Sequence, residues 1–260
     1  EQLYEAYHKQ MLHFVNLKLS VNNYIERMFA LYAPATFLSL FIDDCITKGK
    51  DYYNGGARYN TTYIQCTGLG TTTDCFATIK KHVFEEKRYT MDELLTAVAA
   101  NFEGHEKMRQ YIMNRTPFFG NDDEYADTIA VKVYEDLVAA IKGHPNTRGG
   151  ETQLNMLSTT CHNYFGSVCH ATPNGRLAHF AISDGTSPAH GADTNGPTSV
   201  IKSLGKLDQT QSGGTLLNMR FIPALLKRDE DLDKLVSLIR AYFKMGGHHV
   251  QFNIVDTQTL

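Results

Sequence analysis

Residues that could form a polar binding pocket are concentrated between Thr152 and Leu207. This stretch is rich in glycine, proline and Asn/Asp turn residues, and a long structured loop inside a compact chain is usually functional. We therefore expect the loop to lie against an active site. The side chains that would supply hydrogen-bond donors and acceptors there are Thr159, Thr160, Arg176, Asp184 and Asn195.

The adjacent Cys161 and His162 suggest nucleophilic catalysis. We expect the pair at a strand end, where neighbouring side chains point to opposite faces, so a buried structural thiol is the better interpretation of Cys161. The sequence has no G-x-S-x-G, no H-E-x-x-H and no P-loop lysine motif. It therefore gives no support to a serine hydrolase, a zinc protease or a P-loop enzyme.

Two other patterns have a chemical and a structural interpretation. Gly68-Leu69-Gly70 follows a predicted strand and could hold a phosphate at a helix start, but the third glycine and the acidic partner of a nucleotide-binding domain are missing. A close strand–helix turn is favoured. The acidic residues between Asp122 and Asp127 lack EF-hand spacing, so helix capping is favoured over a cation site. We expect no bound metal.

Composition excludes several classes of partner. The 260 residues are 42% apolar and 20% charged, with a formal net charge of -3, so we expect neither nucleic-acid nor membrane-surface binding. No apolar run approaches the roughly 20 residues that span a bilayer. The five cysteines include no C-x-x-C pair, which indicates free thiols and a cytoplasmic location.

The elements that would position these residues alternate between helix and strand. Strands are predicted at 57–66, 153–157, 216–221 and 248–255. Helices are predicted within 1–32, at 36–48, from the capping segment 71–74 to about 84, in two pieces over 91–115, at 123–142, and from 229 or 231 to 245. Thr90 and Glu93 form a capping box, and Asn121 or Asp122 caps the helix that follows. The alternation predicts an α/β fold.

Several of these motifs together resemble the glycyl radical enzymes, the family of pyruvate formate-lyase and glycerol dehydratase. The stretches that carry the resemblance are GGARYN at 55–60, FGNDDEYAD at 119–127, Pro173-x-Gly175-Arg176, Ser187-Pro188-x-His190-Gly191-x-Asp193, Gly196-Pro197-Thr198 and GGTLLNMRF at 213–221. The family-motif residues are Gly55, Gly56, Arg176, His190, Asp193 and Gly196.

The resemblance implies the second half of a ten-stranded α/β barrel of the pyruvate formate-lyase type, with helices outside. It also implies radical chemistry: a cysteine thiyl radical in the barrel abstracts a substrate hydrogen, and a glycyl radical generates the thiyl. An activating enzyme that uses S-adenosylmethionine and a [4Fe-4S] cluster installs the glycyl radical, so no cofactor is bound directly.

Neither radical site is expected within this chain. It contains no Gly-Cys-x-Glu motif and no R-V-x-G-Y loop. We therefore expect residues 1–260 to be one partial barrel domain, truncated at both ends, with no catalytic residue of its own and no activity in isolation.

Within the family, stretches such as MLSTTCHNYFG and GGHHVQFN are most similar to the hydroxyproline dehydratase type. The implied reaction is trans-4-hydroxy-L-proline dehydration, and the implied substrate-binding residue is Thr159. Ser158 departs from the proline of that pattern, and the absence of arginine there disfavours a sulfonate substrate. Cleavage of another C–O, C–N, C–S or C–C bond stays open, as in isethionate sulfite-lyase, choline trimethylamine-lyase, glycerol dehydratase or formate acetyltransferase-like enzymes. A non-catalytic barrel homologue is the other alternative.

The partners implied by the resemblance are a small-molecule substrate, the radical S-adenosylmethionine activating enzyme and a second copy in a homodimer. The setting would be anaerobic metabolism in the cytoplasm.

Overall fold

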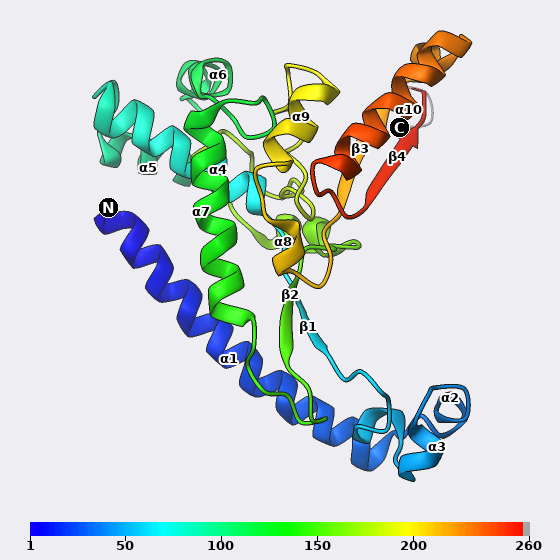
Figure 1. Ribbon diagram of the computed structural model, residues 1–260. Helices are drawn as coiled ribbons and strands as arrows, with labels where there is room; N and C mark the ends of the chain where they lie inside the picture. The colour runs from blue at the N-terminus through cyan, green and yellow to red at the C-terminus, as the bar shows by residue number, and fades with distance from the viewer. Residues whose placement is uncertain (257–260) are drawn as a thin grey trace. The chain divides into compact units, whose positions relative to one another are not determined.

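The computed structural model describes residues 1–256, and they form two compact units (Figure 1). The first unit comprises residues 1–64 and 136–154, and the second comprises residues 65–135 together with residues from 155 onward. Within the described residues, no helix is both long and apolar enough to cross a membrane.

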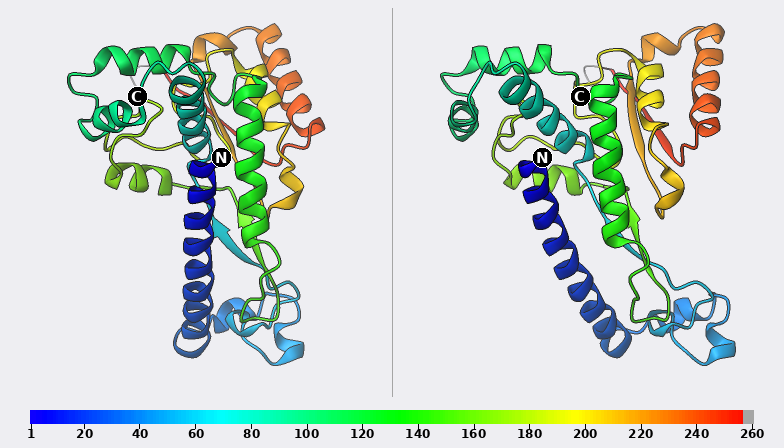
Figure 2. Two further views of the ribbon diagram at one scale, coloured as in Figure 1. Left: turned by 90° about the vertical axis from the view of Figure 1, so that its left-hand side faces the viewer. Right: turned by 60° about the vertical axis from the view of Figure 1, so that its left-hand side comes forward.

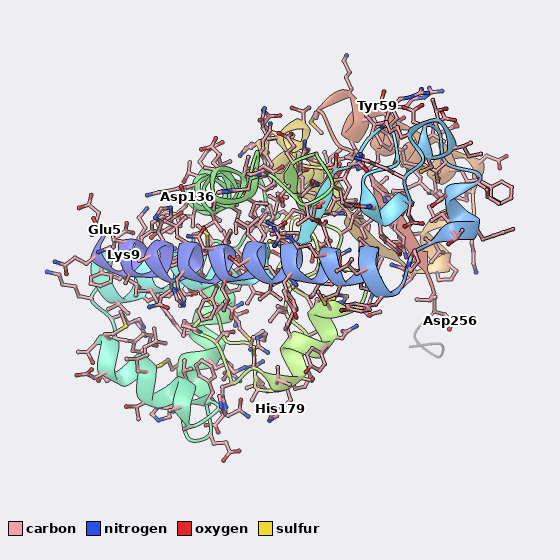
Figure 3. All side chains as sticks on the ribbon, turned by 90° about the horizontal axis from the view of Figure 1, so that it is seen from below. Glu5, Lys9, Tyr59, Asp136, His179 and Asp256 are labelled. Atoms are coloured by element: carbon pink, nitrogen blue, oxygen red, sulfur yellow. The ribbon has the colours of Figure 1, made fainter. Side chains whose placement is uncertain are left out.

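The first unit is built on the long helix α1 (Gln2–Tyr32), which confirms the predicted helix. Val15 and Leu19 are its buried residues. Figure 3 shows Glu5 and Lys9 near the start of the helix. There the Tyr4 hydroxyl donates a 2.6 Å hydrogen bond to Asp136 near the end of α7 (Glu124–Ile141), which ties the two helices together.

A partly buried carboxylate organises the other end of α1. Glu26 accepts hydrogen bonds from the Thr62 and Thr147 hydroxyls, and Arg148 Nε lies 3.3 Å from its Oε1. Burial alone would raise the pKa of Glu26, but these hydrogen bonds and the arginine charge lower it. The carboxylate therefore stays ionised and holds the 146–148 turn against the start of strand β1 (Thr62–Gln65).

The predicted helix over 36–48 is wrong as a single element. The chain forms α2 (Thr36–Ser39) and α3 (Cys45–Lys48), separated by Asp44 with φ +76°. A non-glycine residue in this left-handed conformation cannot continue a helix. The predicted strand over 57–66 is also shorter than expected, since only β1 pairs, and a 3-10 turn η1 (Tyr52–Asn54) precedes it.

Within the described residues the strands form two two-stranded sheets. β1 pairs with β2 (Thr152–Asn155), and both strands begin in the first unit and end in the second. A parallel bridge between Met156 and Thr215 leads on to β3 (Leu217–Phe221), which pairs in parallel with β4 (Val250–Ile254). Helices connect the strands, so the predicted α/β class is confirmed.

The remaining helices belong to the second unit, apart from the last residues of α7 (Figure 2). They are α4 (Leu69–Thr78), the π-helix η2 (Ile79–Glu85), α5 (Met91–Ala99), α6 (Glu106–Arg115), α7, α8 (Cys161–Val168), α9 (Pro197–Leu204) and α10 (Asp229–Lys244), with short 3-10 turns η3 (Gln209–Gln211) and η4 (Pro223–Leu226). Both hydrogen bonds of the predicted Thr90–Glu93 capping box are present at α5.

Other predicted helix starts are corrected. Thr71 to Asp74 lie inside α4, whose N-cap is Gly68. At α7 the Asp123 carboxylate, not Asn121 or Asp122, accepts from a first-turn amide, that of Tyr125, at 2.9 Å. Cys161 and His162 begin α8 rather than lying on a strand, so the long predicted loop is interrupted by a helix.

Candidate functional site

The loop Ser183–Ser187 is fully buried and holds together the ends of several strands in the second unit. Ser183 carbonyl accepts hydrogen bonds at 2.9 Å from the Gly68 amide and the Thr67 hydroxyl, just beyond β1. Thr186 donates from its amide and its hydroxyl to the Leu216 carbonyl at the start of β3. We call residues 183–187 the strand-end loop.

Asp184 is the charged centre of the strand-end loop. Its carboxylate accepts 2.8 Å hydrogen bonds from the Ser187 hydroxyl and from the side-chain Nδ2 of Asn218 in β3. His162 Nε2 of α8 lies 4.0 Å away. Among the described residues, His162 Nδ1 and Asn218 Oδ1 are buried without a hydrogen-bond partner. The loop, α8 and β3 thus meet around one buried carboxylate.

The strand-end loop can approach the sheet this closely because of Gly185. It has φ +44°, and a Cβ there would lie 2.6 Å from both the Met156 and the Leu216 carbonyl oxygens. Any side chain would therefore push apart the two strand ends that the loop joins.

Ser158 follows β2 and is 1% exposed. Its hydroxyl donates a 2.9 Å hydrogen bond to Thr67 Oγ1 and accepts one from the Gly185 amide. Its carbonyl accepts from the Thr159 hydroxyl at 2.7 Å and from the Cys161 amide at 2.9 Å. All polar atoms of Ser158 except its amide are therefore engaged in fixing this turn.

Thr159, the predicted substrate-binding residue, has an unusual backbone. Its φ is +50°, and a β-branched residue in that region is strained by about 1–3 kcal/mol. The residue is exposed within the described chain. Strain of this kind persists only where the surroundings impose it, and it is concentrated at functional sites.

The start of α4 has no room for a phosphate. A Cβ at Gly70 would lie 2.9 Å from the Ala189 nitrogen and the Ser187 oxygen, so the chain after the strand-end loop packs directly on this helix. The Thr71 amide is already bonded to the Ser183 hydroxyl at 3.0 Å. The favoured interpretation of the Gly68–Gly70 turn, a close strand–helix contact, is confirmed.

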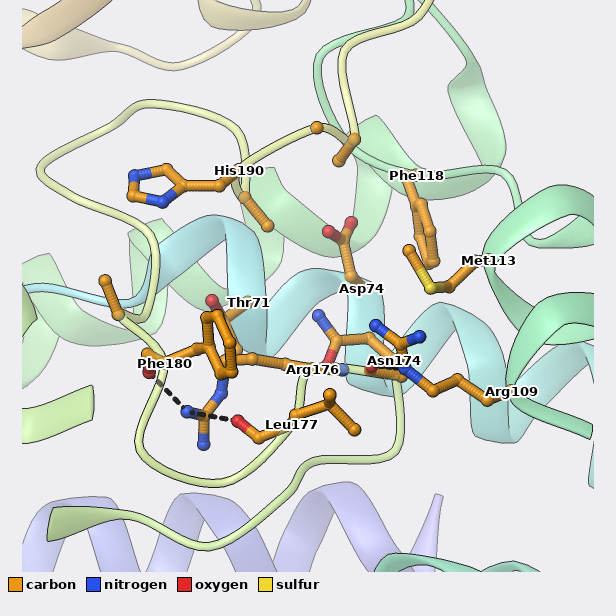
Figure 4. Close-up of a pocket in the computed structure, with 15 residues that line it drawn as sticks. Thr71, Asp74, Arg109, Met113, Phe118, Asn174, Arg176, Leu177, Phe180 and His190 are labelled. Carbon is orange, nitrogen blue, oxygen red and sulfur yellow. Dashed lines mark hydrogen bonds between the residues drawn. The ribbon is translucent and has the colours of Figure 1, made fainter. Parts of the chain in front are cut away.

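A cavity of about 190 Å³ lies beside this contact (Figure 4). Its lining is largely apolar, with polar groups from α4, α6 and the 174–192 segment. The residues that matter for its chemistry are Asp74, Arg109, Phe118, Arg176, Phe180 and His190.

Arg176 shapes one wall of this cavity and binds no carboxylate within the described residues. Its guanidinium donates to the carbonyls of Leu177 (3.2 Å), Phe180 (2.6 Å) and His170, and its Nε donates to the Thr172 hydroxyl. Burial lowers its pKa. Backbone carbonyls accept most of the hydrogen bonds that Arg176 donates, so this side chain holds the 170–180 turn together.

Asp74 lies fully buried against the same cavity. Its Oδ1 accepts the Phe119 amide at 2.8 Å, whereas its Oδ2 is buried without a partner among residues 1–256. Burial raises the pKa of this carboxyl well above its ordinary value. The group is therefore held as a neutral acid over a wider pH range than an exposed aspartate.

The predicted site residues are only partly brought together. Arg176 and His190 line the same cavity, whereas Thr159, Asp193 and Gly196 do not contribute to its lining. Gly196 has φ +83° and precedes Pro197 at the start of α9, which is a backbone role.

Gly55 and Gly56 belong to the first unit and also have backbone roles. A Cβ at Gly55 would lie 2.6 Å from the Arg148 carbonyl oxygen, and one at Gly56 would lie 2.1 Å from that of Lys50.

Sequence reasoning missed Asn121. Its side chain bonds the backbone on both sides of the α9 approach: Nδ2 donates to Ala192 carbonyl at 2.7 Å, and Oδ1 accepts the amides of Thr194 and Asn195. The local sequence predicts Asn121 or Asp122 only as a helix cap, and partners more than 70 residues away are not visible in that pattern.

A charged cluster beside α9 was also missed. Lys206 Nζ lies 2.7 Å from the buried Asp127 and 3.3 Å from Asp122, which supports the structural interpretation of these acids. Within residues 1–256 there is no group of three or more His, Cys, Asp or Glu side chains placed to hold a metal ion.

Comparisons with known proteins give consistent results. A family model described as pyruvate formate lyase-like matches residues 1–166, and one described as glycine radical matches residues 182–260. The chain is 48% identical over 260 residues to trans-4-hydroxy-L-proline dehydratase of Clostridioides difficile, and 36% identical over 270 aligned residues to isethionate sulfite-lyase of Oleidesulfovibrio alaskensis. Each alignment covers all of this chain but only 33% and 32% of the relative.

Solved structures agree. Hydroxyproline dehydratase from Clostridioides difficile with trans-4-hydroxy-L-proline bound superposes with a TM-score of 0.96 over 100% of this chain and 33% of that one. The glycerol-bound B12-independent glycerol dehydratase of Clostridium butyricum, 38% identical, gives 0.92 over 98% and 33%. The chain thus spans about a third of the length of these relatives.

Proposed function

The chain belongs to the pyruvate formate-lyase-like family of glycyl radical enzymes and has part of their α/β barrel fold, and from this premise we propose that the protein containing it is a glycyl radical dehydratase. The observation that supports a particular substrate is the 48% identity, without a break in coverage, to a trans-4-hydroxy-L-proline dehydratase. Isethionate sulfite-lyases and glycerol dehydratase share less of the sequence.

The proposed reaction is the elimination of water from trans-4-hydroxy-L-proline. A cysteine thiyl radical abstracts a hydrogen atom from the carbon next to the C–OH group. The C–O bond then breaks, and the hydroxyl leaves as water together with a proton from the substrate. The cysteine thiol returns a hydrogen atom to the product radical, which regenerates the thiyl radical. The present 260 residues contain neither Gly-Cys-x-Glu nor R-V-x-G-Y, so both radical sites are assigned to other parts of the same protein. In this proposal residues 1–260 form part of the wall of the barrel.

Within this wall we assign substrate contact to Thr159. The support is physical: the residue stands exposed at the end of β2, and its strained backbone is held by Ser158 and by the start of α8. Because strain costs stability, its retention is explained if it places the threonine side chain toward substrate.

The remaining parts of the proposal follow from family membership. The partners are the radical S-adenosylmethionine activating enzyme and a second copy of the protein in a homodimer. The location is the cytoplasm, which agrees with five free cysteines.

The deciding experiment is anaerobic turnover by the full-length protein after activation. The glycyl radical is first quantified by electron paramagnetic resonance, and loss of hydroxyproline, glycerol or isethionate is then measured in parallel. We expect hydroxyproline to be consumed with the highest kcat/KM. A protein that carries the radical but leaves hydroxyproline unchanged would refute the substrate assignment. Failure of an activation-competent preparation to form any radical would refute the enzyme assignment.

A further inference from the structure

We propose that Ser158 is a positioning residue that sets the conformation of Thr159 and thereby tunes substrate affinity. The inference rests on the proposed function, since it assumes that Thr159 meets substrate. Ser158 itself is buried, at 1% exposure, so it acts through its neighbour and not by contact with substrate.

The Ser158 hydroxyl is fixed from two sides. It donates to Thr67 Oγ1, which itself donates to Ser183 carbonyl, and it accepts from the Gly185 amide. Both partners are held by the strand-end loop. A hydroxyl that donates to one fixed group and accepts from another has a defined rotamer and cannot turn away.

The same residue determines the next peptide. Its carbonyl accepts both the Thr159 hydroxyl and the Cys161 amide, so the peptide plane between residues 158 and 159 is held while α8 begins. Thr159 is thereby held at φ +50°, a conformation that an unconstrained threonine avoids. The Ser158 hydroxyl anchors residue 158 to Thr67 and Gly185, so its loss would let the residue move away from the strand-end loop. The peptide plane that follows would then shift with it, and Thr159 could return to an ordinary conformation.

The test is a double-mutant cycle in the activated full-length enzyme. Ser158→Ala is expected to lower kcat/KM about tenfold, chiefly through a higher KM, and Thr159→Ala to lower it about tenfold or more. If Ser158 acts through Thr159, the double variant will be no more than about twofold worse than Thr159→Ala alone. If Ser158→Ala does not fold, Thr67→Val takes its place in the cycle. This variant keeps Ser158 but removes the hydroxyl that accepts its hydrogen bond, so it should lower kcat/KM by a similar factor.

Ser203→Ala is the matched control. Ser203 is another fully buried serine whose hydroxyl has two partners, Asp127 Oδ2 and the Asp122 amide, but they lie beside α9. The KM of the Ser203→Ala variant should stay within about twofold of that of the unmodified enzyme. Any effect of Ser203→Ala on kcat/KM should add to that of Thr159→Ala. Additive effects of Ser158→Ala and Thr159→Ala would overturn the positioning role. An unchanged kcat/KM in Thr159→Ala would instead overturn the proposed substrate contact.

Discussion

Asp74→Asn should make the protein more stable, and increasingly so as pH rises. The Asp74 carboxyl is completely buried, Oδ1 accepts the Phe119 amide, and Oδ2 has no partner in the part of the chain that the structure describes. An asparagine can keep the bond to Phe119 through its own Oδ1. The substitution therefore removes an ionisable group while preserving the one hydrogen bond that it makes.

The sign follows from the direction of the pKa shift. Burial raises the pKa of Asp74 in the folded state above its value of about 3.9 in the unfolded chain. Between these two values the unfolded chain releases a proton that the folded chain retains, so each pH unit lowers the stability of the unmodified protein by about 1.4 kcal/mol. The Asp74→Asn variant does not lose stability in this way, so its stability relative to the unmodified protein rises with pH. The difference becomes constant above the pKa that Asp74 has in the folded protein.

The assay is urea denaturation of the full-length protein and the variant at several values between pH 4 and pH 8. Asp231→Asn is the control of opposite sign, because hydrogen bonds from Arg228 and Lys234 lower the pKa of Asp231. The ionised Asp231 stabilises the folded protein above the pKa that this carboxyl has in the unfolded chain. The variant should therefore lose stability at high pH and not at low pH. A difference between Asp74→Asn and the unmodified protein that does not change with pH would refute the reasoning. Asp74→Ala should be about 1–3 kcal/mol less stable than Asp74→Asn at every pH, because the Phe119 amide loses its acceptor.

Three further predictions concern packing and charge. Lys206→Met should cost about 3–5 kcal/mol in urea denaturation, since it leaves the buried Asp127 without its cation, and adding Asp127→Asn should recover much of this loss. Gly70→Ala should cost about 1–3 kcal/mol by thermal denaturation, because a Cβ there would lie 2.9 Å from backbone atoms. In the control Gly104→Ala the Cβ meets open space, so this variant should cost only about 1 kcal/mol of backbone strain. Equal losses of stability in the two variants would contradict the packing argument. Thr159→Gly should raise stability by about 1 kcal/mol while lowering kcat/KM, and a loss of stability would show that the backbone at this residue is not strained.

Features that depend on neighbouring residues in the sequence were predictable. The capping box at Thr90 and Glu93 lies within four residues and was found in full. The alternation of strands and helices was also predicted, and so was the close turn at Gly70, because a missing side chain next to a helix start has few other uses.

Features that depend on distant residues were not predictable from pattern alone. Thr71 looks like a helix cap, but its hydroxyl accepts the Ser183 amide, 112 residues away. Asp44 precedes α3 in a left-handed backbone conformation that aspartate only occasionally adopts, so the predicted helix over 36–48 is not continuous. Asn121 was assigned to the nearest helix, although its partners lie beyond residue 190. In each case a tertiary contact prevailed over the local preference.

The strand-end loop also constrains the order in which the chain can fold. Ser183 bonds residues that precede it by more than 110 positions, and Thr186 bonds a residue 30 positions later. Contacts so distant in sequence form slowly, because the intervening chain must first be brought together. The loop makes these contacts only where β1, α4 and β3 have come together, and the same docking gives the Ser158 hydroxyl its partners. A molecule in which this loop is not docked would therefore lack the contacts that hold Thr159 in its left-handed backbone conformation.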